Sequence, residues 1–331
     1  MFILGISAFY HDSAAVLLKD GVLVAAAEEE RFSRLKHDNR FPQLASEFCL
    51  KTAGISAQDL DYVVFYEKPL LKFERIIQTQ LSGFPQSWRA FGEAMISWLS
   101  DKLWVRTHIQ NHLDLPSEKI LFVDHHVSHA ASAFFASPFK ESALLTVDGV
   151  GEWTTSLKGM ATADWDGTGQ NEIKVLGEQR FPHSLGLLYS AFTAFLGFRV
   201  NNGEYKVMGM SPYGSPNHVD KIEKLFRVYD DGSFWTDMSY FSYHVSPDQS
   251  FNRKFVDLFG FPRQHTDEFY TSQTNPELNP NDRQVMYNQY YADVAASIQH
   301  VTEESLIKML KALHAETGSK NLCMAGGVAL N

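Results

Sequence analysis

The sequence predicts an α/β protein built from two related halves. Segments of strand and helix character follow one another along the chain, and a three-stranded meander near residue 1 recurs near residue 143. The 331 residues are enough for two domains of ordinary size, and hydrophobic residues make up 44% of them, which is enough for a substantial core. We therefore expect two halves, over residues 1–142 and 143–331, that face one cleft.

Three strands open the first half. Apolar, β-prone runs cover residues 2–9, 14–18 and 22–27. Asp20 and Gly21 separate the second run from the third, and this dipeptide is typical of a hairpin turn. A helical period over 42–53 and a strand over 61–66 follow. From about 70 to 115 large apolar residues recur at helical spacing, so we expect an amphipathic helical insertion there.

The second half repeats the pattern. A short strand at 120–123 and a helix at 125–135 lead into it, and strands are expected at 143–147, 154–158 and 173–181, the last two around a turn-rich patch at 166–169. Helices are expected at 186–195 and from about 284 to 315, and a final strand at 322–325. Pro, Gly, Asp and Ser punctuate residues from about 212 to 282, which favours an irregular insertion.

Composition excludes several classes of protein. Lys and Arg number 29 against 39 Asp and Glu, a net charge of −10, so nucleic acid is not an expected partner. No window holds the 18 or so continuous apolar residues of a membrane span, and the first residues carry no basic stretch of a signal peptide. The only cysteines, Cys49 and Cys323, do not form a disulfide framework or a cysteine zinc site. We expect a soluble, cytoplasmic protein.

A histidine motif is the first candidate site. In the segment 124–129, His125 and His129 stand four residues apart, so a helix would place both imidazoles on one face, where they can reach one metal ion. Two histidines still need a carboxylate or water, and Asp148 at the end of a strand is the candidate. The alternative is a polar helix start with surface or hydrogen-bonded histidines.

Two glycine-bearing turns are the next candidates. Asp148 is followed by Gly149 and Gly151, so backbone amides can approach a phosphate while the carboxylate holds a metal ion. The alternative is a hairpin turn without a ligand. Gly326 and Gly327 follow the last strand and offer a close backbone surface for a nucleotide, although a plain turn explains them equally well.

Two polar clusters complete the candidates. Residues 11–13, 28–31 and 36–38 are expected to converge at the same end of the first meander, unless they are merely solvated turn residues. The segment from Asn201 to Lys206 is dense in polar residues and precedes an apolar, strand-like run from Val207. It fits a pocket wall and a capped turn equally well.

Together these motifs resemble the O-carbamoyltransferase family, which includes the nodulation-factor and the cephamycin or aminoglycoside antibiotic carbamoyltransferases. The matching stretches are 5–15, 27–38, 125–133, 147–153, 206–214 and 325–331, in the family order. The resemblance implies the actin-like ATPase fold, a duplicated RNase H-like architecture with helical and irregular insertions. That fold is similar to the universal tRNA threonylcarbamoyladenosine synthase.

The resemblance also implies the chemistry. The family makes carbamoyl-adenylate from carbamoyl phosphate and ATP in a carboxy-terminal YrdC-like domain of the same parent chain. It then transfers the carbamoyl group to a hydroxyl of a small-molecule acceptor in the domain present here, in secondary metabolism such as antibiotic biosynthesis. We expect this chain to be a fragment cut at its nucleotide loop. The prediction also allows this protein to form a homodimer.

The family pattern assigns roles to individual residues. A divalent metal, Fe²⁺ by expectation, is placed on His125, His129 and Asp148, with a further aspartate beyond Asn331. ATP or carbamoyl-adenylate is placed on Lys36, Asp148, Gly149, Gly151, Gly326, Gly327 and Asn331. The acceptor is assigned to Ser184, Gly186, Glu204 and Lys206. His11 is expected to be the general base, with Asp12 beside it, because imidazole is suited to proton transfer near neutral pH.

Two other functions stay open at this point. The first is a sugar or metabolite kinase of the same fold, in which an aspartate activates the hydroxyl. The histidine pair argues against it, because Mg²⁺ prefers carboxylate and water ligands, whereas imidazole suits softer metals. The second is a nucleotide-dependent binding module that is inactive on its own.

Overall fold

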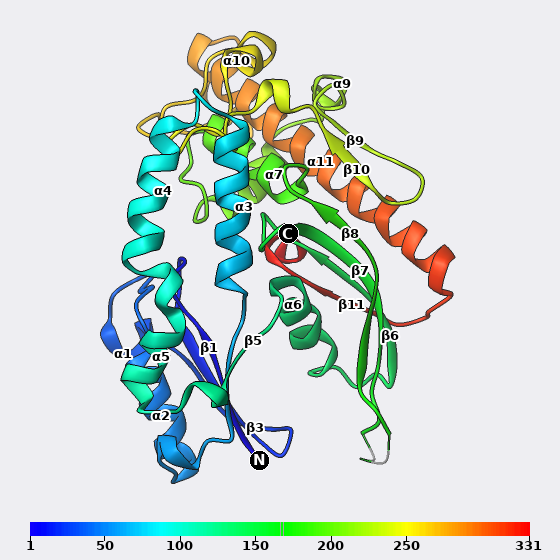
Figure 1. Ribbon diagram of the computed structural model, residues 1–331. Coiled ribbons are helices and arrows are strands. Elements are labelled where there is room, and N and C mark those ends of the chain that lie inside the picture. Colours follow the sequence, from blue (N-terminus) through cyan, green and yellow to red (C-terminus); the bar gives the residue numbers. More distant parts are fainter. Residues whose placement is uncertain (166, 168) are drawn as a thin grey trace. The chain divides into compact units, whose positions relative to one another are not determined.

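The first sheet follows from the alternation of apolar side chains along the opening strands. Its strands are β1 (Phe2–Ser7), β2 (Ala14–Lys19), β3 (Val22–Glu28), β4 (Tyr62–Phe65) and β5 (Ile120–Phe122). In the computed structural model their order is β3-β2-β1-β4-β5, with β4 parallel to β1 and to β5 (Figure 1). Asp20 and Gly21 join β2 to β3 with φ values of 51° and 80°, as a two-residue hairpin requires. The predicted hairpin is confirmed.

The structure describes residues 1–165, 167 and 169–331. Two of the four residues in the expected turn-rich patch at 166–169 therefore lie outside the described residues. The chain divides into a first unit of residues 1–82 and 88–128 and a second unit of residues 83–87 and 129–331. Helix α6 (His125–Phe134) runs from one unit into the other, whereas the sequence predicts a boundary after residue 142.

Helices α2 and α5 pack on the first sheet. The helices of this unit are α1 (Glu30–Ser33), α2 (Gln43–Ala53), α3 (Pro69–Ser82), α4 (Trp88–Ser100) and α5 (Val105–Leu113). Cys49 of α2 and Ile109 of α5 are buried in one core with Leu4 and Val63 of the sheet. The last third of the expected insertion over 70–115 thus contributes to this core. The other two thirds, α3 and α4, pack against each other through the stacked rings of Phe73 and Trp98.

The second sheet repeats the first in its topology. Its strands are β6 (Glu141–Val147), β7 (Thr154–Thr162), β8 (Glu172–Arg180) and β11 (Leu322–Ala325). The order β8-β7-β6-β11 reproduces β3-β2-β1-β4, with the same antiparallel meander and the same parallel fourth strand. The recurrence of the meander that the sequence predicts is confirmed.

Helices cover β6 on both faces. Ala143, Leu145 and Val147 face a core that includes α7 (Leu185–Phe195) and α11 (Arg283–Thr317), while Leu144 packs with residues of α6. A strand buried on both faces is a continuous apolar run rather than an alternating one, which is the pattern at 143–147. Figure 1 shows α11 as the long orange helix beside the strands of this sheet.

The segment after α7 departs from the prediction. Residues from Val207 belong to helix α8 (Glu204–Met210), so the expected strand-like run is wrong. The carboxylate of Glu204 accepts hydrogen bonds from the backbone N–H groups of Asn201, at 2.9 Å, and Gly203, at 3.1 Å, which fixes the turn directly before the helix. This local hydrogen bonding favours a helix start where hydrophobicity alone suggests a strand.

The segment from 212 to 282 contains regular elements within its irregular path. They are α9 (Val219–Ile222), β9 (Phe226–Val228), β10 (Phe234–Thr236) and α10 (Arg253–Phe259). Phe226, Phe234 and Phe255 are buried in the core of the second unit, so this segment completes that core. Single 3₁₀ turns occur at Ala57–Asp59, Lys102–Trp104, Ser117–Lys119, Ser211–Tyr213, Met238–Tyr240 and Gly327–Leu330. Across the described residues, every helix is too short or too polar to cross a bilayer.

Candidate functional site

Polar residues follow the parallel strands of the first unit. His11 and Asp12 come after β1, Glu67 comes after β4, and His125 comes after β5. The carboxyl ends of parallel strands meet at one edge of a sheet, and loops there commonly carry ligand and catalytic residues. The expected convergence of polar residues at this end of the meander can therefore be examined contact by contact.

Two loops are fastened together at this edge. The backbone N–H of Phe9 donates to the carbonyl of Asn39 at 2.8 Å, and the Asn39 amide donates to the carbonyl of Tyr10 at 3.1 Å. The buried Ser13 hydroxyl donates to the carbonyl of Asp38 at 3.0 Å. The loop after β1 and the loop at 34–39 are consequently one structural unit, which brings residues 11–13 and 36–38 together as the sequence predicts.

Asp12 lies between two imidazoles. Its Oδ2 is 2.5 Å from Nδ1 of His11, and its Oδ1 is 3.0 Å from Nδ1 of His37. Burial raises the pKa of Asp12, but hydrogen bonds and electrostatic attraction from the rings of His11 and His37 outweigh that effect and hold the pKa below its ordinary value. Glu30 adds a second carboxylate, because its Oε2 accepts the backbone N–H of His37 at 3.1 Å. Asp12 is therefore an ionised acceptor for both rings.

Asp38 and Lys36 of the same loop differ in burial. The buried side chain of Asp38 accepts two hydrogen bonds from the guanidinium of Arg40, at 2.9 and 2.6 Å. These bonds hold the pKa of Asp38 far below its usual range, so this loop anchor is ionised at neutral pH. Lys36, the expected nucleotide contact, lies on the same loop with its side chain exposed to solvent.

A buried charge cluster follows β4, and sequence reasoning missed it. The ammonium of Lys72 donates to Glu67 Oε2 at 2.6 Å, and Nδ1 of His125 lies 3.6 Å from the same oxygen. Burial raises the pKa of Glu67, but the nearby His125 imidazole and the Lys72 ammonium outweigh that effect and hold the pKa below its ordinary value. A signal was available, because Glu67 follows a strand as His11 does, and Lys72 lies five residues later in the first turn of α3.

In the second unit the candidate site begins at Asp148, directly after β6. Its Oδ2 lies 3.3 Å from Nε2 of His129, and its Oδ1 accepts the backbone N–H of Gly327 at 3.1 Å. β6 and β11 are parallel neighbours, so their carboxyl ends place Asp148 beside the glycine pair. The structure thus brings together three of the residues that the sequence predicts. His125 stands one turn before His129 on α6.

The glycines of this unit permit close backbone approach. Gly326 has a φ of 98°, and a side chain there would meet the Val147 carbonyl at 2.3 Å. A Cβ on Gly186 would meet the Asp148 carbonyl at 2.5 Å, so the first turn of α7 lies directly against the backbone of the Asp148 turn. Gly186 is therefore a packing residue in the structure, and its expected contact with an acceptor stays a prediction.

Ser184, Gly149 and Gly151 form hydrogen bonds within the chain. Ser184 caps α7 by accepting the N–H of Leu187 at 3.0 Å, and it donates to the Gly149 carbonyl at 2.6 Å. The N–H of Gly151 donates to Thr154, which closes the turn after β6. These contacts tie the Asp148 turn to the helix that follows it.

Three further predicted residues lie near the ends of helices. Glu204, the first residue of α8, accepts the Ser190 hydroxyl at 3.0 Å, while the ammonium of Lys206 lies 5.9 Å from the ring of Phe198. The Asn331 amide pairs with Gln299 of α11 through two hydrogen bonds, of 2.5 and 3.2 Å. Their proposed contacts with the acceptor or nucleotide would be additional to these.

The donor set at Asp148 fits a divalent ion. Ligands about 2.1 Å from one metal stand about 3 Å apart when they are adjacent, which is close to the separation of His129 and Asp148. Imidazole with carboxylate suits iron, manganese or zinc better than Mg²⁺. The residues present are compatible with the expected metal.

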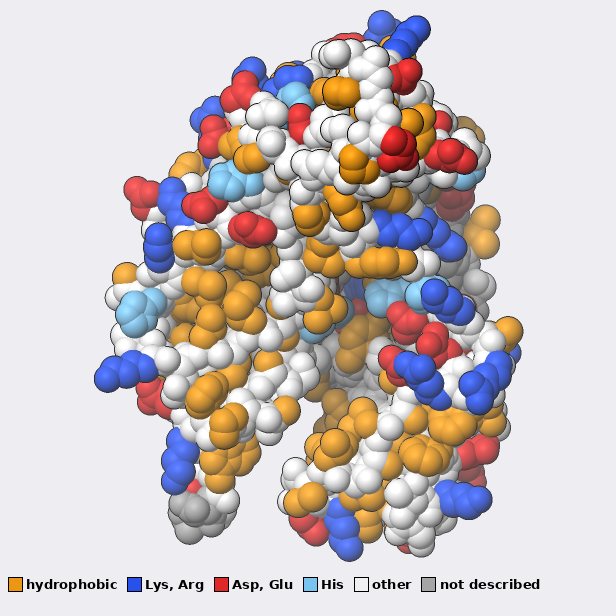
Figure 2. All heavy atoms as spheres, turned by 180° about the vertical axis from the view of Figure 1, so that it is seen from behind, with side chains coloured by type: hydrophobic (Ala, Val, Ile, Leu, Met, Phe, Trp, Pro, Cys, Tyr) orange, Lys and Arg blue, Asp and Glu red, His pale blue; other side chains and the backbone are white. Residues whose placement is uncertain are grey.

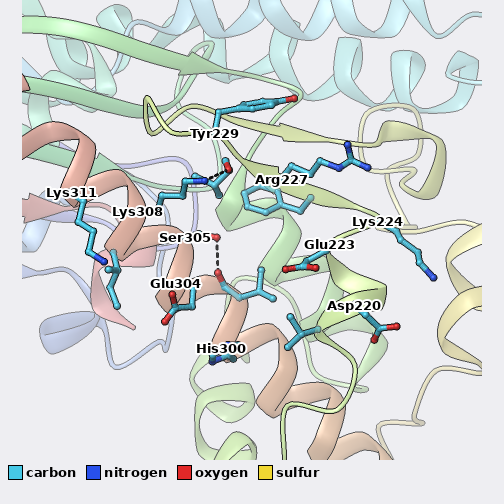
Figure 3. Close-up of a pocket in the computed structure, with 15 residues that line it drawn as sticks. Asp220, Glu223, Lys224, Arg227, Tyr229, His300, Glu304, Ser305, Lys308 and Lys311 are labelled. Carbon is cyan, nitrogen blue, oxygen red and sulfur yellow. Dashed lines mark hydrogen bonds between the residues drawn. The ribbon is translucent and has the colours of Figure 1, made fainter. Parts of the chain in front are cut away.

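A separate groove of about 900 Å³ lies in the second unit, lined by α9, β9 and α11 (Figure 3). Its charges are of both signs, and the Lys308 ammonium already binds the Val228 carbonyl and Asp230, each at 2.9 Å. Among the described residues that line this groove, none belongs to the predicted site. On the face drawn in Figure 2, acidic and basic side chains of the described residues are interspersed, without a continuous basic surface.

Comparison with known proteins relates this geometry to a family. A family profile described as carbamoyltransferase N-terminus matches residues 2–331. The uncharacterized protein sll1178 of Synechocystis sp. is 49% identical over 339 aligned positions, which cover 99% of this chain and 51% of that protein. The nodulation protein NolNO of Sinorhizobium fredii is 31% identical over 329 positions, covering 98% of this chain and 41% of its own. The chain spans about half the length of these curated relatives.

Two solved structures illustrate distant similarity. Component A of the (R)-2-hydroxyglutaryl-CoA dehydratase of Acidaminococcus fermentans matches 99% of this chain and 84% of its own, with 12% identity and a TM-score of 0.42. A type II variant of the Aquifex aeolicus Ppx/GppA phosphatase matches 98% of this chain with a TM-score of 0.29. Similarity at this level does not identify a fold.

Proposed function

The chain belongs to the carbamoyltransferase N-terminus family, and from that membership we propose that it transfers a carbamoyl group from carbamoyl-adenylate to a hydroxyl of a small-molecule acceptor. The family match over nearly the whole chain supports the transferase class. The structural observation that carries the mechanism is the contact between His11 and Asp12, which orients an imidazole at the carboxyl edge of the first sheet.

The proposal includes the actin-like fold. Two sheets share the strand order of an antiparallel meander followed by a parallel strand, and this duplication supports a pair of RNase H-like halves. In each unit the candidate residues follow the strands that begin the repeat, β1 and β6. Equivalent positions in a duplicated fold thus carry different chemistry, a base in the first unit and a metal-ligating carboxylate in the second.

We assign proton transfer to His11. With Nδ1 donating to Asp12, the lone pair on Nε2 is available to take the proton of the acceptor hydroxyl. The hydroxyl oxygen forms a bond to the carbamoyl carbon, and the bond between that carbon and the phosphate oxygen of AMP breaks. The products are a carbamate ester, AMP and a proton carried by His11. Carbamoyl-adenylate is a mixed anhydride and is already activated. Besides proton transfer, the reaction therefore needs only positioning of the acceptor and stabilisation of the developing charge.

We assign the metal to His129 and Asp148, with His125 from the preceding turn of α6. When bound, such an ion supplies Lewis-acid stabilisation of charge on the departing phosphate. Gly149, Gly151, Gly326, Gly327 and Lys36 are assigned to the nucleotide. The close approach of Gly326 to β6 supports this part, because it leaves backbone amides, rather than side chains, beside Asp148.

The test supplies carbamoyl-adenylate, Fe²⁺ and a panel of monosaccharides and polyols under anaerobic conditions. We expect acceptor-dependent release of AMP together with a carbamate ester that is detectable by mass spectrometry. Parallel reactions contain ATP in place of carbamoyl-adenylate. Transfer of the γ-phosphate to an acceptor would contradict carbamoyl transfer and support the kinase alternative.

A prediction on metal affinity tests the second assignment separately. Asp148→Asn removes an anionic ligand but keeps an oxygen that accepts the N–H of Gly327, so the turn is retained. We expect the affinity for Mn²⁺ or Fe²⁺, measured by calorimetry and by the EPR signal of free Mn²⁺, to fall by about 100-fold or more.

Asp220→Asn is the matched control for that variant, because it removes an exposed carboxylate of α9 in the same unit. Its metal affinity should equal that of the unmodified chain. Equal metal affinity in the Asp148 variant would mean that the ion does not bind at this carboxylate.

A further inference from the structure

We propose that His37 is a positioning residue for His11 and acts through the shared carboxylate of Asp12, an inference that rests on the proposed carbamoyl transfer. His11 and His37 contact different oxygens of one carboxylate, at 2.5 and 3.0 Å. Asp12 therefore cannot rotate to serve one ring without losing its bond to the other. The chain holds the two imidazoles and the carboxylate in a His-Asp-His arrangement within the first unit.

The backbone at His37 has a left-handed conformation. His37 has a φ of 58° and Phe9 has a φ of 68°, a left-handed conformation that non-glycine residues rarely adopt. Each residue lies on one of the two fastened loops. The bonds from Phe9 to Asn39 and from Ser13 to Asp38 flank the contact with Asp12 on both sides. These contacts compensate for two unfavourable backbone conformations, which is common where a site needs a fixed geometry.

The nitrogens of His37 define its role. Nδ1 faces Asp12, and Nε2 is buried without a hydrogen-bond partner among the described residues. A proton on that buried Nε2 would be an unsatisfied donor, which is costly. His37 therefore suits a neutral donor to Asp12, and His11, whose side chain is half exposed, suits contact with a substrate.

The charged groups that face this arrangement come from two segments. Asp12 and His11 lie on the loop after β1, and Glu30 lies on α1. Glu30 accepts the backbone N–H of His37 rather than a ring nitrogen. Removing the His37 side chain thus leaves the negative charge of Asp12 to act on His11 alone, which stabilises the protonated form of His11.

Two variants separate this role from a merely structural one. His37→Gly removes the ring at a φ that glycine adopts readily, and His37→Asn keeps a short amide donor on a residue that tolerates the same backbone. The readouts are the NMR titration of the His11 imidazole, identified by its loss in His11→Gln, and the pH profile of carbamoyl transfer to polyols. His300→Asn on α11 is the matched histidine control.

In His37→Gly we expect the His11 titration and the acid limb of the pH profile to move together to higher pH. We expect kcat to fall about tenfold with KM for carbamoyl-adenylate unchanged, because the base is less well oriented. His37→Asn should restore most of both properties. If His37→Gly, with an unchanged circular dichroism spectrum, leaves the His11 titration where it is, the inference is overturned.

The NMR readout also separates this inference from the function on which it rests. A His11 titration that responds to His37→Gly in a chain without carbamoyl transfer supports the coupling and overturns the proposed function. Should the glycine variant fail to fold, His37→Asn is compared with and without Asp12→Asn, because any effect of His37→Asn on the His11 titration must disappear once the shared carboxylate is neutral. Asp12→Asn is then expected to move the His11 titration to lower pH, because it removes the negative charge.

Discussion

His11→Ala is expected to lower the rate of carbamoyl transfer from carbamoyl-adenylate by about 100- to 10,000-fold, because it removes the group that takes the proton of the acceptor hydroxyl in the proposed mechanism. The contact with Asp12 Oδ2 at 2.5 Å orients this ring and stabilises the cation that forms on it. The measurement is kcat/KM from AMP release with a polyol acceptor. Metal affinity, determined by the Asp148 ligands of the other unit, should be unchanged.

His112→Ala provides the control for that variant, because His112 lies on α5 of the same unit and its Nδ1 forms a hydrogen bond with the carbonyl of His108 at 2.8 Å. Its transfer rate should remain within about twofold of the unmodified chain, as expected for a substitution remote from the reacting groups. If His11→Ala transfers the carbamoyl group as fast as the unmodified chain, His11 is not the base.

Lys72→Met is expected to lower the free energy of unfolding by about 3–5 kcal/mol, because it leaves the carboxylate of Glu67 buried without its cation. The two side chains are 11% and 8% exposed, and their charged atoms are 2.6 Å apart. Urea denaturation followed by circular dichroism measures the effect. The double variant Glu67→Gln with Lys72→Met should recover most of the loss, because neither charge is then buried.

The pair of Arg89 and Glu93 on α4 provides a matched surface comparison. Its atoms are 2.9 Å apart, but the side chains are 60% and 50% exposed, so Arg89→Met should cost less than about 1 kcal/mol. Equal effects of the two substitutions would show that burial of the Glu67 pair has no energetic consequence.

The direction in which stability changes with pH follows from the lowered pKa of Glu67. Its pKa in the folded chain lies below its ordinary value, so its contribution to stability is complete above a pH of about 4.3 and is lost as the pH falls further. The stability difference between the unmodified chain and the double variant should therefore narrow under acid conditions.

Much of the fold could be predicted from local patterns. The Asp20-Gly21 turn has a strong signature because its two positive φ values require such residues. The run at 143–147 predicts a strand, and the recurrence of the meander predicts the second sheet. The prediction of a strand-like run from Val207 was wrong, because the hydrogen bonds that Glu204 accepts from Asn201 and Gly203 fix the turn before the helix, and a hydrophobic period does not contain them.

Part of the candidate site could likewise be predicted from short-range sequence patterns, and part could not. Glycine pairs, the i,i+4 histidines and the acidic turn after a strand are visible in the sequence because each depends on residue types at short spacing. The pairing of Glu67 with Lys72 was missed because burial, which makes that pair costly to break, is not a property of either residue alone. His37 was visible as a neighbour of Lys36, but its link to His11 was not.

The sequence by itself determined the α/β class, the repeated meander, the family and the residue types gathered at the strand ends, since these depend on composition and short-range periodicity. Only the tertiary structure decided that Asp12 joins two histidines and that Asp148 stands between an imidazole and a glycine amide. The participants in each contact are up to 179 positions apart in the chain. Their meeting depends on strand pairing and loop packing, which no local pattern contains.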